Sequence, residues 1–293
     1  MTLALSGLSK RSATARSALT MPSSLLSCGA VRAAVAVLFF FINVTGVQAG
    51  EVRAAVATNF SAPMKELIQA FESLSKHKVI VSFGSTGVLF AQLTQGASFD
   101  VFLAADQKRP TQATVNGLAV KGSQITYAVG RLALYCAHPE IELDADYLAQ
   151  GEFERLAIAN PATAPYGVAA MQVIASLGAG DDVSSRIVRG NNVAQAYQFV
   201  ASGAAELGLI ANSQIALNTD GSRWLVPEEL HQPIAQDAVL LSGAENNPAA
   251  NQFMAWLAGA QARAIIRRFG YQDAAPSGSK KNNPDDGPGW SER

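Results

Sequence analysis

The chain has 293 residues, of which 49% are hydrophobic, 15% charged and 8% aromatic, and its formal net charge is −1. This length allows one or two domains with a sizeable buried core, and the composition is that of an ordinary globular protein. The absence of a basic excess argues against nucleic acid as a partner.

The N-terminal region, residues 1–49, has the composition of a secretory signal peptide. Its charged residues are Lys10, Arg11, Arg16 and Arg32, with no Asp or Glu. A mostly apolar run over 33–47 follows, and Val47-Gln48-Ala49 forms a small-x-small cleavage signal before Gly50. The run is shorter than the roughly 20 residues that a membrane-spanning helix needs, so an uncleaved anchor is the weaker alternative. Met21 is an alternative start, and removal of the leader takes the formal charge to near −5.

The C-terminal region, residues 274–293, is rich in Pro, Gly, Ser and charge, so we predict a disordered tail. The folded part then covers about 50–273. It contains one cysteine, Cys136, which excludes an intrachain disulfide. A lone cysteine inside an apolar strand is typical of a small core residue.

Short apolar runs alternate with helical periodicity along the folded part. In the first half we predict strands at 51–57, 78–83, 99–105 and 125–137, and helices at 63–76 and 88–96. In the second half we predict strands at 155–159, 185–190, 206–211, 224–227 and 237–243, and helices at 166–178, 191–203 and within 248–271. This alternation predicts an α/β fold with parallel sheets, in which ligands bind beyond the carboxyl ends of strands.

Four of the predicted strand-to-helix loops share one chemistry. Their tips are Thr58-Asn59-Phe60-Ser61, Gly84-Ser85-Thr86-Gly87, Thr163-Ala164-Pro165-Tyr166-Gly167 and Gly190-Asn191-Asn192-Val193. None contains a charged residue or a histidine, and each offers hydroxyl, amide or backbone N–H groups at a helix start. One such loop indicates only a helix cap. Four of them favour an anion site, because helix N-termini carry unpaired N–H groups and a partial positive charge.

The lack of carboxylates in these loops narrows the class of anion. A protonated oxyanion such as hydrogen phosphate needs an acceptor at its site, and these loops provide none. The pattern therefore favours a fully deprotonated dianion of the sulfate or molybdate type, held by donors alone.

Two further segments resemble the periplasmic molybdate-binding proteins of ABC importers. They are FDVFLAADQKRP at 99–110, with Asp100 and the Ala-Asp-Gln of 105–107, and LAGAQARAIIRRFGY at 257–271. The resemblance extends over about 51–272. It implies a two-lobed type II binding-protein fold, each lobe a mostly parallel sheet flanked by helices, with the ligand cleft between the lobes. Lobe 1 would comprise 50–129 and 234–273, and lobe 2 would comprise 130–233.

Carried over position by position, the resemblance implies a set of residues that bind the oxyanion. They are Thr58, Asn59, Ser85, Thr86, Tyr166 and Val193, the last through its backbone N–H. For Asn59, either the backbone N–H or the side-chain amide could donate, and the register leaves Ser85 and Thr86 open as the main donor. Many family members have a Tyr where this chain has Ala211, and the Tyr166 phenol could replace that donor.

The function implied by the resemblance is capture of molybdate or tungstate in the periplasm and delivery to the permease of an ABC transporter. We expect a monomer without a cofactor or direct metal ligands. The alternatives are a binding protein for another oxyanion such as sulfate, and a periplasmic oxyanion sensor. We do not expect an enzyme, because His77, His138 and His231 are isolated from one another and no nucleotide-binding motif is present.

Overall fold

The computed structural model describes residues 49–179, 181–218 and 220–273. The predicted tail (274–293) and all but the last residue of the predicted signal peptide (1–49) therefore lie outside the described residues. No helix in the described ranges is both long enough and apolar enough to span a membrane.

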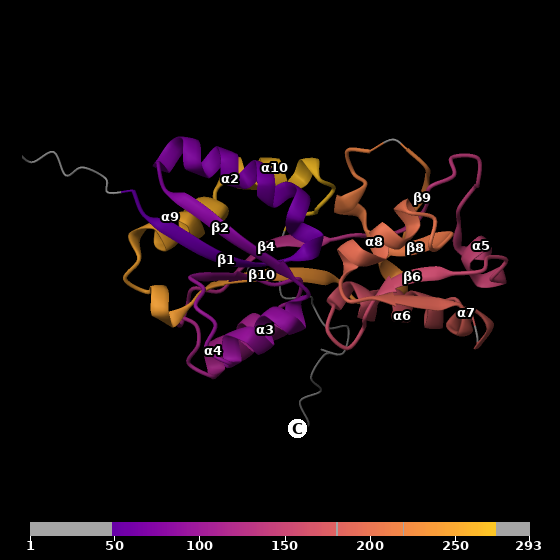
Figure 1. Cartoon of the computed structure of the whole chain (residues 1–293), viewed down its shortest axis with the longest axis horizontal. Helices are drawn as coiled ribbons and strands as arrows, with labels where there is room; N and C mark the ends of the chain where they lie inside the picture. The colour runs from indigo at the N-terminus through magenta and orange to yellow at the C-terminus, as the bar shows by residue number, and fades with distance from the viewer. Residues whose placement is uncertain (1–48, 180, 219, 274–293) are drawn as a thin grey trace, which may run out of the picture. The chain divides into compact units, whose positions relative to one another are not determined.

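The described chain builds two five-stranded sheets, and we call the part built on each sheet a lobe (Figure 1). The first sheet has the order β2-β1-β3-β10-β4, with β1 (Glu51–Ala57), β2 (Lys78–Gly84), β3 (Val101–Leu103), β4 (Ile125–Gly130) and β10 (Ile234–Leu240). The second has the order β7-β6-β8-β5-β9, with β5 (Leu132–Cys136), β6 (Leu156–Ala159), β7 (Ile187–Gly190), β8 (Leu207–Ala211) and β9 (Ser222–Leu225).

Both sheets are mixed, and each contains a single reversed strand. In the first sheet, β10 is antiparallel to both of its neighbours, so the other strands run in one direction. In the second sheet, β5 is the reversed strand. The mostly parallel lobes implied by the resemblance are confirmed, and the reversed strand of each sheet is the one that follows a crossing between the lobes.

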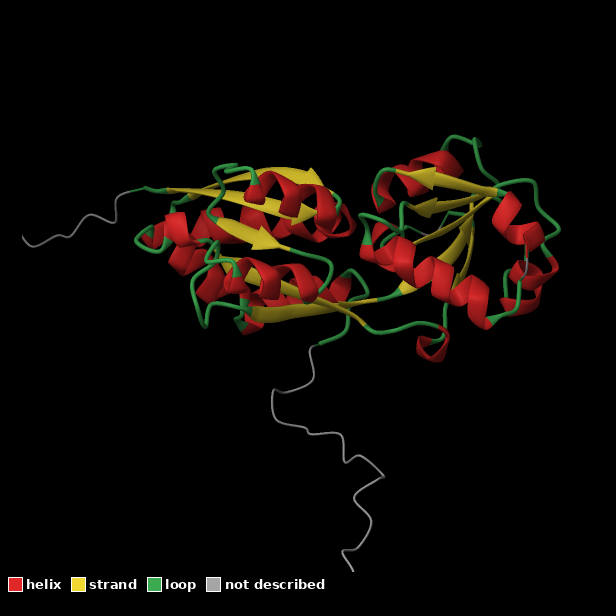
Figure 2. Cartoon of the chain, turned by 90° about the horizontal axis from the view of Figure 1, so that it is seen from below, coloured by secondary structure: helices red, strands yellow, loops and turns green. Residues whose placement is uncertain are grey.

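Helices cover both faces of each sheet (Figure 2). Those of the first lobe are α2 (Ser61–Ser75), α3 (Thr86–Thr94), α4 (Lys108–Val115), α9 (Pro248–Leu257) and α10 (Ala260–Arg268). Those of the second are α5 (Ala145–Gln150), α6 (Pro165–Ser176), α7 (Asp181–Ser185) and α8 (Val193–Ala201). Short 3₁₀ turns are η1 (Thr58–Phe60), η2 (Asn212–Gln214), η3 (Glu228–Leu230) and η4 (Ser242–Ala244).

Strand β1 shows why this layering forms. Val52, Ala54 and Val56 lie in one apolar core with residues of α2, α9 and α10. Ala55 points the other way and packs with residues of α3 and α4. Successive side chains of a strand face opposite sides of a sheet, so a strand that is apolar throughout must be covered on both faces.

The structure differs from the sequence-based elements in several places. The strand predicted at 125–137 is two strands, β4 and β5, which belong to different sheets and are separated by Arg131. The strand predicted at 237–243 begins earlier, at Ile234. Helices α4, α5 and α7 were not predicted, because each has at most eight residues. Cys136 is buried and free, as predicted for a core residue.

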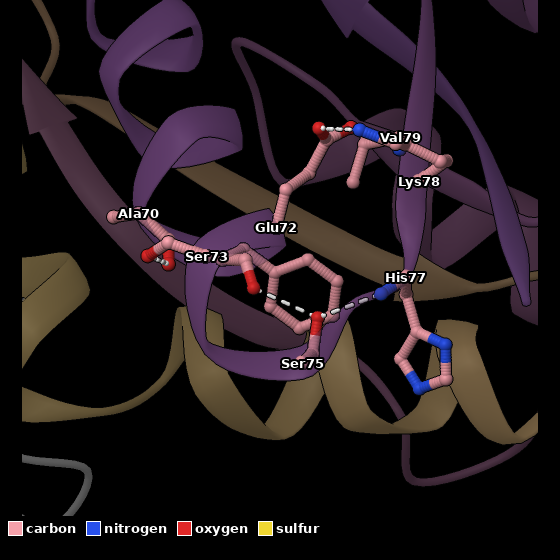
Figure 3. Close-up of polar contacts among 8 residues, drawn as sticks. Ala70, Glu72, Ser73, Ser75, His77, Lys78 and Val79 are labelled. Atoms are coloured by element: carbon pink, nitrogen blue, oxygen red, sulfur yellow. Dashed lines mark hydrogen bonds and ion pairs between the residues drawn. The ribbon is translucent and has the colours of Figure 1, made fainter. Parts of the chain in front are cut away.

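The junction between α2 and β2 is fixed by side-chain contacts (Figure 3). Lys76 ends the helix with a positive φ of 60°. The Glu72 carboxylate accepts hydrogen bonds from the Val79 backbone N–H at 3.0 Å and from Lys78 Nζ at 2.7 Å. Strand β2 pairs in parallel with β1, which brings the loops at the two carboxyl ends next to each other.

Candidate functional site

A small cavity lies at the carboxyl ends of the central strands and has walls from both lobes. All six residues implied by the resemblance line it: Thr58, Asn59, Ser85, Thr86, Tyr166 and Val193. The remaining lining residues are Ala57, Ala105, Ala164 and Pro165. Each of the six is at most 8% exposed. The chain thus brings together residues from four loops around one small cavity.

The first wall is the turn between β1 and α2, formed by Thr58 and Asn59 in η1. The Asn59 side-chain amide faces other partners, because its Nδ2 donates to Gln236 Oε1 at 2.8 Å and to Tyr271 Oη at 2.9 Å. Of the two Asn59 donors considered from the sequence, the side-chain amide is therefore occupied, and the backbone N–H is the candidate.

The second wall is the start of α3. Ser85 is the N-cap residue, and its Oγ is buried without a hydrogen-bond partner. The adjacent Thr86 Oγ1 accepts a hydrogen bond from the Ala105 backbone N–H at 3.0 Å. Both residues line the cavity, but only the Ser85 hydroxyl has no partner. Buried polar atoms in native proteins rarely remain unpaired, so the orphaned hydroxyl indicates a ligand position.

The third and fourth walls are the starts of α6 and α8 in the second lobe. Pro165 is the first residue of α6, where its missing N–H costs nothing, and Tyr166 follows it. The Tyr166 hydroxyl accepts a hydrogen bond from Gln236 Nε2 at 3.2 Å. Val193 begins α8, whose N-cap Asn192 accepts from the Gln195 backbone N–H at 3.0 Å. The Tyr166 phenol is thus tied to the opposite lobe, as well as lining the cavity.

The electrostatics of the cavity favour an anion. None of the lining residues is charged. Helices α2, α3, α6 and α8 begin at or next to the cavity, and none has an acidic residue in its first turn. The partial positive charges of these helix starts are therefore not neutralised by carboxylates. Such a cavity can hold an oxyanion by N–H and O–H donors alone.

Contacts between the lobes surround the cavity. The Gly87 backbone N–H in α3 donates to the Thr163 carbonyl of the second lobe at 2.8 Å. The Ser213 hydroxyl in η2 donates to the Asn59 carbonyl at 2.7 Å. The cavity therefore has its observed walls only when the two lobes are in contact.

Sequence analysis did not identify a second set of polar residues behind the cavity: Tyr127, Ser213, Gln236 and Tyr271. One signal was available, because Gln236 and Asp237 interrupt an otherwise apolar strand and are buried. Burial raises the pKa of the phenols of Tyr127, Tyr166 and Tyr271, so all three keep their protons at neutral pH.

The histidines are separate from one another and from the cavity. His77 Nδ1 accepts from the Gly50 backbone N–H at 2.9 Å. His231 Nδ1 contacts the neighbouring Gln232 carbonyl, and His138 is exposed beside Glu140. Across the described ranges, no group of three or more His, Cys, Asp or Glu side chains could hold a metal ion.

Comparison with known proteins agrees with this architecture. Residues 52–272 match the family described as bacterial extracellular solute-binding protein. The chain belongs to this family. As a solute-binding protein of this class, it is assigned to a location outside the cytoplasm.

Individual relatives of this solute-binding protein match over nearly their whole length. Molybdate-binding protein ModA of Azotobacter vinelandii is 48% identical over 228 residues, which cover 76% of this chain and 90% of that protein. Molybdate-binding protein ModA of Rhodobacter capsulatus is 44% identical over 223 residues, covering 76% and 88%. The solved structure of the Azotobacter vinelandii periplasmic molybdate-binding protein superposes with a TM-score of 0.74 at 39% identity, covering 76% of this chain and all of that one.

Proposed function

We propose that this protein captures molybdate or tungstate in the periplasm and delivers it to the membrane permease of an ABC transporter. The observation that carries the proposal is the uncharged cavity, which four helix starts and the orphaned Ser85 hydroxyl surround. The relatives named as molybdate-binding proteins support the choice of ligand.

The mechanism is reversible binding without covalent chemistry. Thr58, Asn59, Ser85 and Thr86 offer donors from the first lobe, and Tyr166 and Val193 offer donors from the second. A dianion that binds groups from both lobes favours the closed arrangement over the open one, and the permease then recognises that arrangement. If about seven charge-assisted hydrogen bonds contribute roughly 1.5–3 kcal/mol each before association costs, micromolar or tighter binding results.

Selectivity follows from the chemistry of the walls. Hydrogen phosphate carries a proton that needs an acceptor, and no carboxylate lines the cavity. Phosphate is therefore disfavoured. Sulfate carries the same charge as molybdate but is smaller. Discrimination between these two anions therefore depends on the size of the cavity when the lobes are closed.

The test is thermal melting of the purified protein with molybdate, tungstate, sulfate or phosphate. At about 100 times its dissociation constant, a ligand stabilises the folded protein by roughly 2.7 kcal/mol, which raises Tm by several degrees. We expect a rise with molybdate and tungstate and none with phosphate. A rise with sulfate alone would support the sulfate-binding alternative, and no rise with any anion would contradict the proposed function.

A further inference from the structure

The Gln236 side chain, which lies behind the cavity, connects the two lobes. It belongs to β10 in the first lobe and is fully buried. Its Oε1 accepts from Asn59 Nδ2 at 2.8 Å, and its Nε2 donates to Tyr166 Oη at 3.2 Å. One amide therefore links a wall residue of the first lobe to a wall residue of the second, although Gln236 does not itself line the cavity.

The backbone around Gln236 is shaped for this contact. The pairing of β10 with β4 shifts register between Gln236 and Asp237, which face Ala128 and Thr126, so Tyr127 of β4 is an extra residue opposite this point. Bulges redirect side chains next to functional sites. On β4, Gly130 leaves the space that the contact needs, because a Cβ there would lie 2.1 Å from Tyr166 Oη and 2.5 Å from Gln236 Nε2.

The remaining groups of Asn59 are held in the same network. Tyr271 Oη accepts from Asn59 Nδ2 at 2.9 Å, and Ser213 of the second lobe donates to the Asn59 carbonyl at 2.7 Å. Tyr271 Oη also lies 3.1 Å from Ser213 Oγ. Both the side-chain amide and the carbonyl of Asn59 are thus fixed from behind, so the turn it shares with Thr58 has a defined position against the cavity.

We propose that Gln236 is a positioning residue of the anion site. Gln236 fixes the Thr58–Asn59 turn by accepting a hydrogen bond from the Asn59 amide. It also connects this turn to Tyr166 of the second lobe. The position of the turn and the closure of the second lobe therefore depend on each other. This inference rests on the proposed function, since it assigns Gln236 a role in capture of the same anion. Networks of fully paired buried groups act as a unit, which gives the coupling its physical basis.

The test is a Gln236→Met variant, which keeps the side-chain length and removes both polar groups. Molybdate affinity is measured by calorimetry, and the dissociation rate by stopped-flow fluorescence. We expect a 10- to 100-fold weaker affinity, with most of the change in the dissociation rate, because the lost contact to Tyr166 holds the two lobes together around the anion. Small-angle scattering at saturating molybdate is expected to show a larger mean radius of gyration than for the unmodified protein.

The control is Ser123→Ala. Ser123 Oγ accepts a hydrogen bond at 3.1 Å from the N–H of Leu240, which belongs to β10 but does not line the cavity. The control variant is expected to lower Tm without changing affinity. An unchanged affinity and dissociation rate in Gln236→Met would overturn the inference while leaving the proposed function intact. Failure of the unmodified protein to bind any of the four anions would instead overturn the proposed function.

A ligand-free measurement tests the coupling separately. Thermal midpoints are compared for Gln236→Met, Tyr166→Phe and the double variant. Because the two groups bond across the lobes, the double variant is expected to lose clearly less stability than the sum of the single losses. Additive losses would show that Gln236 and Tyr166 act independently and would overturn the inference whatever the ligand.

Discussion

At the scale of single residues, neighbouring hydroxyls in the cavity wall have different roles. Ser85 Oγ is buried without a partner, whereas Thr86 Oγ1 accepts a hydrogen bond from the Ala105 N–H. An unpaired buried hydroxyl costs about 1–3 kcal/mol of folding free energy. A bound ligand whose oxygen accepts a hydrogen bond from the Ser85 hydroxyl would remove this penalty.

The Ser85→Ala substitution separates stability from binding. Without ligand, we expect the free energy of unfolding to stay the same or rise, because an unsatisfied hydroxyl is removed. Molybdate affinity is expected to fall by about 1.5–3 kcal/mol, the contribution of one hydrogen bond to a charged group. Urea denaturation and calorimetry measure the two quantities.

Thr86→Val provides a comparison for the stability measurement alone, because Thr86 also offers a donor to the anion. It leaves the buried Ala105 N–H unpaired, so it is expected to destabilise the ligand-free protein by about 1–3 kcal/mol. If Ser85→Ala lowered stability as much as Thr86→Val and left affinity unchanged, the Ser85 hydroxyl would have only a structural role.

At the scale of elements, the junction of α2 and β2 positions one loop of the cavity and contains the ion pair of Glu72 with Lys78. The Lys78 ammonium, followed by the Val79 backbone N–H, lowers the pKa of the Glu72 carboxyl below its ordinary value. A carboxyl whose pKa is lower in the folded state stabilises the protein above its unfolded-state pKa of about 4.5 and loses that contribution as pH falls through the folded value.

Glu72→Gln is therefore expected to cost more stability at pH 7 than at pH 3. Lys78 is 71% exposed, so solvent screens the ion pair and the loss at pH 7 should be about 1 kcal/mol or less. Urea midpoints measured from pH 3 to 7 for both proteins provide the comparison. A constant difference across this pH range would mean that the ionised carboxylate of Glu72 does not stabilise the junction.

At the scale of the whole molecule, the chain crosses between the lobes where β4 is followed by β5, and again before β10. Gly130, the last residue of β4, lies against the Tyr166 phenol of the second lobe. The close approach of the lobes at this point requires a residue without a side chain.

Gly130→Ala is expected to weaken molybdate binding by more than tenfold, because the added methyl group would lie 2.1 Å from Tyr166 Oη and hold the lobes apart. Gly243→Ala is the matched control, since a Cβ there meets nothing within 4 Å. Calorimetry on both variants measures the effect. Equal affinities would show that the crossing adapts to the methyl group without cost to closure.

The secondary-structure elements of this protein, and the chemistry of its helix starts, could be predicted from its sequence. Alternation of strands and helices depends on periodicity, and the chemistry of a helix start depends on a few adjacent residues. The α/β class and the uncharged character of the four loops therefore followed from short segments. The set of six site residues came from the resemblance to a family; the structure places all six around one cavity, and their role in binding stays a prediction.

The tertiary structure alone decided which donors of these residues remain free. Asn59 loses its side-chain amide to Gln236 and Tyr271, which are 177 and 212 positions away in the chain. The division of the predicted 125–137 strand between two sheets likewise depends on partners elsewhere in the chain. Sequence patterns record the preferences of neighbouring residues, whereas the pairing of buried polar groups is settled only when distant segments pack together.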